Sequence, residues 1–244
     1  MEITYQPVID LQTGRLVKCE AFCRPPEAGV DLDAFVTSAE LNGSLRSFTD
    51  RVLDRVIGDW QKQGPASLDL SINLSVADLA EHDLVKRVEK ACKRHRFDVT
   101  RLWFEIDDRA QSIVDPGMLG NIAKLSGLGV RFSIDSFGDD IAQTTPYELQ
   151  NLRIHEVKFD ARYVRDADEN MAHRNIIVSI VGMGRDLRIA VGVKGVNREN
   201  IAALMARLGV SLGQGYFFAR PTSPATIVSL VERMTLAGPL PIGR

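Results

Sequence analysis

Residues 102–107 read Leu-Trp-Phe-Glu-Ile-Asp, and apolar side chains occupy every second position of this run. Because successive side chains of a β-strand point to opposite faces, the Leu, Phe and Ile would share one face and Glu105 would lie on the other. Residues 68–73 (Leu-Asp-Leu-Ser-Ile-Asn) and 130–135 (Val-Arg-Phe-Ser-Ile-Asp) repeat this alternation. Each run therefore predicts a strand with an acid or an amide near its C-terminal end.

Strand-like and helix-like runs alternate along the rest of the chain. The runs rich in Val, Ile, Leu or Phe that predict strands are 16–24, 67–73, 101–107, 130–135, 154–160, 187–193 and 210–218. The runs that predict helices are 31–42, 46–62, 83–95, 116–127, 170–184, 198–208 and 224–236. This order predicts an α/β fold, either a parallel barrel or a doubly wound sheet, and the polar strand ends favour a (β/α)8 TIM-like barrel. We expect one domain over 1–236 and a flexible C-terminal tail over 237–244.

Composition excludes several classes of partner. The net charge of −2 gives no general attraction to a nucleic acid polymer or to an anionic membrane. Three cysteines are too few for a disulfide framework and indicate a reducing compartment. The N-terminus lacks a signal peptide pattern, and no apolar run approaches the roughly 20 residues of a membrane span. We therefore expect a cytoplasmic protein without membrane insertion.

Polar side chains recur on one face of five predicted strands. Barrel enzymes keep their active sites at the C-terminal ends of the strands, where these side chains would meet. Lys158 and Arg24 would supply positive charge for a phosphate, and the oxygen donors suit Mg²⁺, Mn²⁺ or Ca²⁺ rather than zinc. The donors are Glu20, Asn73, Glu105 and Asp135. The alternative is that solvent or a loop satisfies each group separately, but five strands contributing to the same rim favour a site.

Seven short motifs contain most of these residues. They are Tyr-Gln-Pro-Val-Ile-Asp at 5–10, Glu-Ala-Phe-Cys-Arg at 20–24, Ser-Ile-Asn-Leu-Ser at 71–75, Phe-Glu-Ile-Asp-Asp at 104–108, Ile-Asp-Ser-Phe-Gly at 134–138, Val-Lys-Phe-Asp at 157–160 and Gly-Gln-Gly-Tyr-Phe-Phe at 213–218. In this order, from about residue 5 to residue 221, the chain resembles the EAL domain family of cyclic di-GMP phosphodiesterases. The resemblance implies a (β/α)8 barrel and a role in bacterial second-messenger signalling.

The resemblance also implies a chemistry. The family hydrolyses one phosphodiester bond of cyclic di-GMP to give pGpG, with two divalent cations that polarise water and stabilise the entering and leaving oxygens. It places the first cation on the four oxygen donors, Glu20, Asn73, Glu105 and Asp135. It implies that Lys158 and Gln214 are the catalytic positions that orient water and metal. It implies that the nucleotide is bound by Gln6, Arg24, Asn73 and Asp160.

The chain departs from the family around the second cation. The family's Asp-Asp is matched by Asp135-Ser136, and its Glu-Gly-Val-Glu by 191–194, so that Ser136, Val191 and Lys194 replace acids. The formal charge of the pocket rises by four units, one each at 136 and 191 and two at 194. Two unit charges about 4 Å apart interact by roughly 4 kcal/mol at an effective dielectric near 20. We therefore expect the second metal site to be lost and at most one Mg²⁺, Mn²⁺ or Ca²⁺ to remain.

Neighbouring acids offer an alternative, because Asp139 or Asp140 could reach the pocket from the loop at 138–143, and Asp107 or Asp108 from the adjacent strand end. Without such compensation, the pattern predicts a catalytically degenerate EAL domain that binds cyclic di-GMP and passes the signal to a protein partner. A nucleotide-independent protein-interaction adaptor and a weak phosphodiesterase that produces pGpG stay open. A homodimer is compatible with the resemblance, because the family's loop joins a dimer contact.

Overall fold

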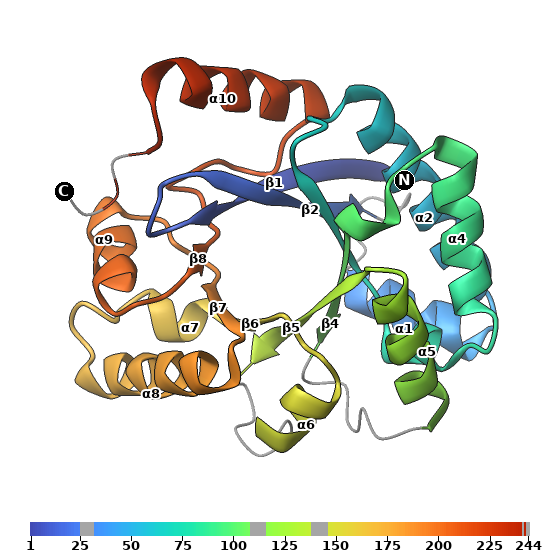
Figure 1. Ribbon diagram of the computed structural model, residues 1–244, viewed down its shortest axis with the longest axis horizontal. Helices are drawn as coiled ribbons and strands as arrows, with labels where there is room; N and C mark the ends of the chain where they lie inside the picture. Colours follow the sequence, from blue (N-terminus) through green and yellow to red (C-terminus); the bar gives the residue numbers. More distant parts are fainter. Residues whose placement is uncertain (25–31, 108–115, 138–145, 241, 243–244) are drawn as a thin grey trace.

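The computed structural model describes residues 1–24, 32–107, 116–137, 146–240 and 242 (Figure 1), without the side chains of 32–33 and 146–148. Eight strands close into a barrel in chain order. They are β1 (Glu2–Asp10), β2 (Leu16–Arg24), β3 (Asp69–Asn73), β4 (Leu102–Asp107), β5 (Arg131–Phe137), β6 (Glu156–Phe159), β7 (Ala190–Val193) and β8 (Leu212–Gly213). The predicted (β/α)8 barrel is confirmed, and the last three strands are shorter than the predicted runs.

The first strand departs from the predicted alternation. β1 pairs antiparallel with both β2 and β8, whereas all other neighbouring strands are parallel. Asp10 Oδ1 accepts from the backbone N–H groups of Gln12 and Thr13 at 2.8 Å, and Gly14 has a φ of +67°. This tight turn joins β1 to β2 as a hairpin, because a turn so short has no room for a crossover helix.

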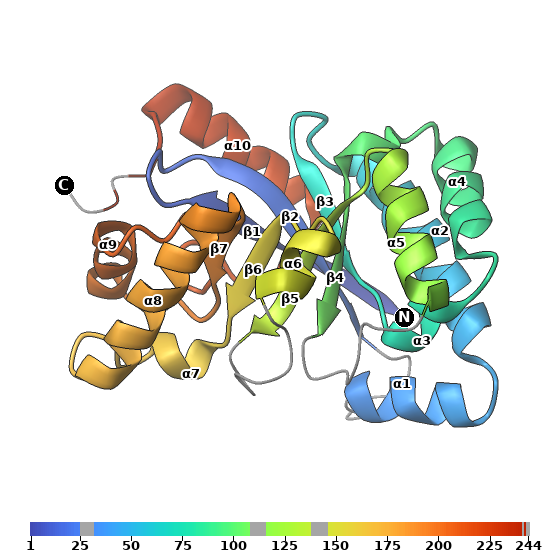
Figure 2. The same ribbon diagram turned by 60° about the horizontal axis from the view of Figure 1, so that its bottom comes forward.

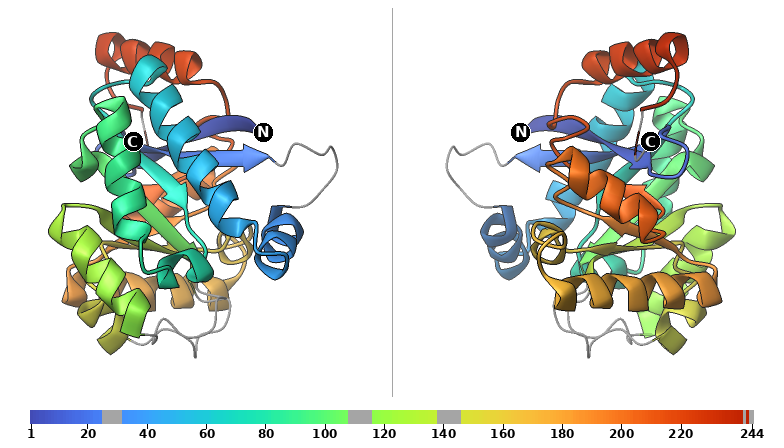
Figure 3. Two further views of the ribbon diagram at one scale, coloured as in Figure 1. Left: turned by 90° about the vertical axis from the view of Figure 1, so that its right-hand side faces the viewer. Right: turned by 90° about the vertical axis from the view of Figure 1, so that its left-hand side faces the viewer.

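Helices surround the barrel (Figures 1 and 2), with α10 and α8 on opposite sides of it (Figure 3). They are α1 (Leu32–Leu41), α2 (Leu45–Gln63), α3 (Val76–Ala80), α4 (Leu84–His95), α5 (Pro116–Gly127), α6 (Pro146–Asn151), α7 (Ala161–Val164), α8 (Met171–Leu187), α9 (Glu199–Arg207) and α10 (Pro224–Ala237), with a 3-10 turn at Val99–Arg101. The seven predicted helices are confirmed. The short α3, α6 and α7 were not predicted, because none is long enough to show a helical hydrophobic period. Among the described helices, none has both the length and the apolar character needed to cross a membrane.

The two faces of the sheet have different chemistry, as the alternation predicts. Leu102, Phe104 and Ile106 of β4 are fully buried and belong to the hydrophobic core between the sheet and the helices. Glu105 is also buried, but it faces the barrel interior, where its partners come from other strands. The arrowheads of β4 and β5 in Figure 2 mark the C-terminal ends of these strands.

A β-bulge interrupts the pairing of β5 with β6. Ile134 pairs with Val157 and Phe137 with Phe159, so that Asp135 and Ser136 together oppose the one residue between Val157 and Phe159. The φ of Ser136 is +55°, which is the left-handed region that most residues avoid. Bulges of this kind redirect side chains and occur often beside active sites. Here the bulge lets the side chains of both Asp135 and Ser136 contact the same ammonium group.

Part of the predicted C-terminal tail contacts the barrel. The backbone N–H of Leu240 donates to the carbonyl of Gly14 at 3.1 Å, and Ile242 packs against the hydrophobic core. Flexibility of the tail therefore stays a prediction, with two contacts that oppose it.

Candidate functional site

The ammonium of Lys158 connects two buried carboxylates at the C-terminal end of the barrel. Lys158 lies on β6 and its side chain is 2% exposed. Its Nζ donates to Glu105 Oε1 and Oε2 at 2.5 and 2.6 Å, and to Glu20 Oε2 at 3.0 Å. The hydroxyl of Ser71 donates to Glu105 Oε1 at 2.5 Å. Three strands besides β6 thus contribute to one charge-assisted hydrogen-bond cluster.

Glu20 receives two further hydrogen bonds. Asn73 Nδ2 donates to its Oε1 at 3.0 Å, and Gln214 Nε2 donates to its Oε2 at 3.0 Å. The position of Asn73 follows from the register of the sheet, in which Asn73 on β3 pairs with Glu105 on β4. Five of the residues predicted from the sequence therefore form one connected network. They are Glu20, Asn73, Glu105, Lys158 and Gln214.

The protonation states in this network follow from burial and from the neighbouring charges. Burial alone would raise the pKa of Glu20, but the ammonium of Lys158 and the amide of Asn73 hold it below its usual value. Burial raises the pKa of Glu105, and the negative charge of Glu20 adds to the effect. Glu105 therefore takes up a proton more readily than Glu20, although Lys158 lies closer to Glu105. Burial would lower the pKa of Lys158, but Glu105 and Glu20 raise it, and Lys158 therefore stays an ammonium.

A second cluster lies beside the first, at the bulge of β5. Lys194 Nζ donates to Asp135 Oδ2 at 2.7 Å and to Ser136 Oγ at 3.3 Å. Burial alone would lower the pKa of Lys194, and the carboxylate of Asp135 raises it above its usual value. Lys194 directly follows β7, and its backbone N–H donates to the carbonyl of Phe159 on β6. The sequence predicted that position 194 carries a positive charge where a metal would need a negative one. In the structure this positive charge pairs with the carboxylate of Asp135.

The structure does not bring Val191 to this rim, and our match of 191–194 with the family's Glu-Gly-Val-Glu is corrected. A Cβ built on Gly184 of α8 would lie 2.5 Å from Val191 Cγ2, so Val191 faces the helices. Its neighbour Gly192 faces the interior, where a Cβ would lie 2.6 Å from Glu156 Oε1. A side chain at position 191 therefore points away from the site.

A second Gly-Val pair in the same stretch gives an alignment with the family's Glu-Gly-Val-Glu that fits the structure. Lys194-Gly195-Val196-Asn197 also has Gly-Val at its centre, and it places the first position of the motif on the rim. Asn197 then replaces the second Glu, and its Oδ1 accepts from the backbone N–H of Tyr216 at 3.0 Å. The rise in formal charge remains four units, one at 136, two at 194 and one at 197.

Of the residues predicted to bind the nucleotide, Asn73 belongs to the network, whereas Gln6, Asp160 and Arg24 do not. Gln6 is buried opposite Glu20 in the register of β1 and β2, and its Nε2 donates to the carbonyl of Ala219 at 3.0 Å. Asp160 caps α7 by accepting from the backbone N–H of Arg162 at 2.8 Å. Arg24 is exposed at the end of β2, and its side chain makes no ion pair or hydrogen bond within the described part of the chain.

The acids that could compensate for the lost charges are described only in part. Asp107 pairs with Asp135 in the register of β4 and β5, so it stands at the same rim. Asp108, Asp139, Asp140 and the loop at 138–143 lie outside the described residues. Compensation by these residues stays a prediction.

The sequence analysis missed a buried ion pair deeper in the barrel. The ammonium of Lys18 contacts Glu156 Oε2, and both side chains are almost fully buried. Lys18 Nζ also lies 4.0 Å from the centroid of the Trp103 ring. Strand alternation could have found this pair, because Lys18 shares a face with Glu20, and Glu156 with Lys158. The interior of the barrel is therefore filled by polar layers, with the candidate site uppermost.

The two predicted metal sites fit the structure unequally. Asp135 Oδ1 and Gln214 Oε1 are buried acceptors with no hydrogen-bond partner in the described part of the chain. With the carboxylates of Glu20 and Glu105 they are the type of oxygen donor that a hard dication takes. Among the described residues, the carboxylate oxygens of Glu20, Glu105 and Asp135 do not all lie within 4.8 Å of one another, and the ammonium of Lys158 pairs with both glutamates. A second dication does not fit, because the hydroxyl of Ser136 and the ammonium of Lys194 stand where its acidic ligands are expected.

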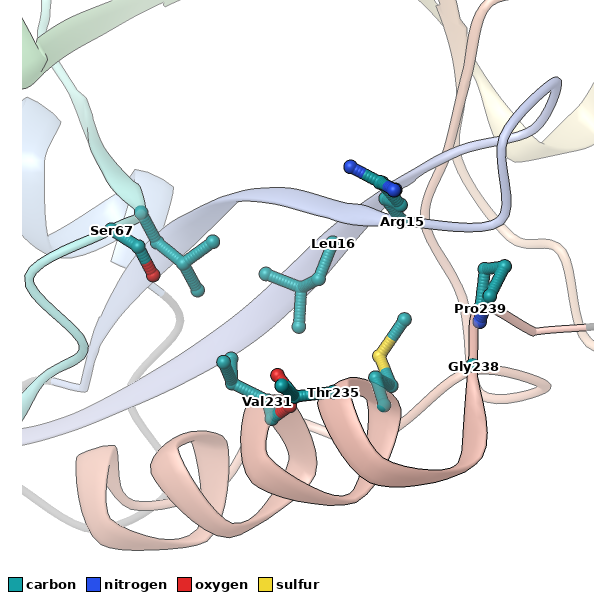
Figure 4. A pocket seen from close by; sticks show the side chains of 9 residues that line it. Arg15, Leu16, Ser67, Val231, Thr235, Gly238 and Pro239 are labelled. Atoms are coloured by element: carbon teal, nitrogen blue, oxygen red, sulfur yellow. Dashed lines mark hydrogen bonds between the residues drawn. The ribbon is translucent and has the colours of Figure 1, made fainter.

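A pocket of about 450 Å³ lies at the other end of the barrel (Figure 4). It is bounded by Arg15 and Leu16 at the start of β2, by Ser67 before β3, and by Val231 and Thr235 of α10. Its lining contains no acid and none of the predicted site residues. The chemistry suggested by the sequence therefore belongs to the polar rim and not to this pocket.

Comparison with known proteins points to one family. The EAL domain matches residues 1–221. The cyclic di-GMP phosphodiesterase PA2567 of Pseudomonas aeruginosa is 27% identical over 238 residues, which cover 95% of this chain and 40% of the relative. The solved complex of the phosphodiesterase PaMucR with c-di-GMP is 27% identical with a TM-score of 0.81, and the match covers 91% of this chain and 92% of that one. The calcium and cyclic di-GMP complex of Klebsiella pneumoniae BlrP1 has a TM-score of 0.80 at 21% identity, over 91% of this chain and 55% of that one. The chain thus spans about two fifths of the curated relative PA2567.

Proposed function

Because the chain belongs to the EAL domain family, we propose that it binds cyclic di-GMP at the C-terminal rim of its barrel and does not hydrolyse it at an ordinary enzymatic rate. In this proposal the domain is a receptor, and a protein partner in the bacterial cytoplasm receives the signal. The three cysteines are free, which agrees with a reducing compartment.

Similarity to a ligand-bound relative supports binding. PaMucR, which is solved with c-di-GMP, is 27% identical to this chain over almost its whole length. The exposed guanidinium of Arg24 can offer a phosphate two parallel hydrogen bonds. Gln6 lies opposite Glu20 in the register of β1 and β2, and Asp160 follows β6 and caps α7.

One observation carries the proposed loss of hydrolysis, namely the ammonium of Lys194 on Asp135 and Ser136. When two dications are bound, they ionise a water and stabilise the leaving oxygen of the phosphodiester. This chain keeps donors for one of them, Glu20, Asn73, Glu105 and Asp135. Its own residues at 136 and 194 offer the other a hydroxyl and a positive charge, which repels a cation.

Calorimetric titration with cyclic di-GMP, in EDTA and then in Mg²⁺ or Ca²⁺, tests binding. Chromatography of the same samples for pGpG tests hydrolysis, with the PaMucR phosphodiesterase domain as the active control. We expect a heat of binding and negligible pGpG. Turnover on the order of 1 per second or more would refute the receptor. Absence of heat at nucleotide concentrations on the order of tens of micromolar would instead support the nucleotide-independent adaptor.

A further inference from the structure

We propose that the ammonium of Lys194 replaces the second divalent cation as a built-in positive charge and itself contacts a phosphate of the bound nucleotide. The consequence is that cyclic di-GMP binding needs no divalent metal at this position. The phosphate contact rests on the proposed function, whereas the replacement of the metal does not.

The placement of Lys194 carries the first half of the inference. Its Nζ lies 2.7 Å from Asp135 Oδ2, a carboxylate that would otherwise share a dication, and 3.3 Å from Ser136 Oγ. The bulge of β5 directs both acceptors to the same ammonium. A dication at this point would meet a fixed positive charge and a hydroxyl instead of two carboxylates. The repulsion is twice that between two unit charges at the same distance.

The hydrogen-bonding capacity of Lys194 supports the contact with a phosphate. An ammonium donates three hydrogen bonds, and two are used on Asp135 and Ser136. The side chain of Lys194 is 26% exposed, compared with 2% for Lys158. Lys194 is therefore the ammonium of this rim that a ligand can reach, and its third donor is available for a phosphate oxygen.

The charge balance agrees with an anionic ligand that arrives without metal. Two ammoniums, Lys158 and Lys194, stand among the carboxylates of Glu20, Glu105 and Asp135. The two ammoniums offset two of these three carboxylates before any metal binds. Arg24 then adds an exposed positive charge at the edge. A cyclic dinucleotide with two negative phosphodiesters can approach such a rim without an added dication.

Metal binding is measured first, because it does not depend on the nucleotide. Mn²⁺ and Ca²⁺ are titrated calorimetrically into the wild type, the double variant Ser136→Asp/Lys194→Glu, and the control Lys93→Glu, which makes the same change as Lys194→Glu at an exposed lysine on α4. We expect the double variant to bind one additional metal, or the same metal at least about tenfold more tightly. Equal metal binding by wild type and double variant would overturn the built-in cation. Circular dichroism and melting temperature establish that each variant is folded.

The phosphate contact is measured with cyclic di-GMP in EDTA. The wild type should bind equally with EDTA and with Ca²⁺, and Lys194→Gln should bind at least about tenfold more weakly. Lys194→Gln/Asp135→Asn separates two origins of this loss. If Lys194 only neutralises Asp135, the double variant recovers the wild-type affinity and the contact is overturned; if Lys194 touches the phosphate, the double variant stays weak.

The two failures are distinguishable. A wild type that needs Ca²⁺ for nucleotide binding overturns this inference and leaves the receptor function standing. A wild type that binds no nucleotide with or without Ca²⁺ overturns the proposed function and the phosphate contact together, while the metal titration alone still decides whether Lys194 replaces a cation.

Discussion

Lys158→Met is the substitution that most directly tests how the rim is held together. The ammonium of Lys158 is the group that separates the carboxylates of Glu20 and Glu105, at 2.5 to 3.0 Å from their oxygens. Methionine keeps much of the length of the side chain and removes its charge. Both carboxylates then lose their shared partner inside the barrel, where each is almost fully buried.

The size of the effect follows from the burial of the pair. Removal of one partner from a buried ion pair costs about 3–5 kcal/mol. Because burial raises the pKa of Glu105, that carboxyl can take up a proton once the ammonium is removed, and we expect the lower end, about 3 kcal/mol. In a chain of about 150–250 residues each kcal/mol lowers the melting temperature by about 2–4 °C, which gives a decrease of about 6–12 °C.

A divalent cation should reverse much of this loss. Without the ammonium, Glu20, Glu105 and Asp135 remain as oxygen donors for a hard cation, which stabilises the fold by about 2.7 kcal/mol at 100 times its dissociation constant. Differential scanning calorimetry in EDTA and in Ca²⁺ measures both effects, with Lys93→Met as the control. The reasoning is refuted if Lys158→Met melts like the wild type in EDTA, or if Ca²⁺ raises its melting temperature no more than that of the wild type.

Three further predictions concern single positions. Arg24→Ala should weaken cyclic di-GMP binding at least about tenfold, because each charge-assisted hydrogen bond contributes roughly 1.5–3 kcal/mol. The melting temperature should stay unchanged. If the control Arg233→Ala, on α10, loses as much affinity, the effect is one of general charge. Val191→Glu should lower the free energy of unfolding by more than about 3 kcal/mol, because the new carboxylate would be buried against α8. Thermal unfolding measures this, and a variant as stable as the wild type would contradict the outward position of Val191. Burial raises the pKa of Asp78, so the folded state takes up this proton before the unfolded chain as the pH falls. The melting temperature of the wild type should therefore rise relative to that of Asp78→Asn between pH 7 and about pH 4, and a constant difference would count against it.

Strand alternation was enough to predict most of the rim. Glu20, Glu105 and Lys158 were assigned to the interior face because side chains alternate along a strand, and parallel neighbours bring their C-terminal ends together. The structure brings all three into contact. The long helices were equally predictable from their hydrophobic periods. These features depend on residues close in sequence, so one segment at a time contains the necessary information.

The features that the sequence left undetermined depend on geometry between segments. Two Gly-Val pairs lie three residues apart in 191–197, and only the direction of the side chains shows that Lys194, not Val191, reaches the rim. The bulge at Asp135 and Ser136 contains no glycine, so the sequence gives no signal for it. Lys18 looks like a surface lysine in sequence, and its burial became visible only with Glu156 beside it.

The substitutions at 136 and 194 are best understood together, because either one alone would harm the fold. Asp135 lies beside Ser136 at the bulge and is largely buried. Loss of an acid at 136 weakens the hold on a metal, and loss of the metal would leave Asp135 as a buried carboxylate without a partner, which is costly. Lysine at 194 supplies that partner permanently. Under the proposed function, a rim that keeps its carboxylates and exchanges a metal for a lysine is stable without the metal, and this stability is the physical condition for a domain that binds the ligand without hydrolysing it.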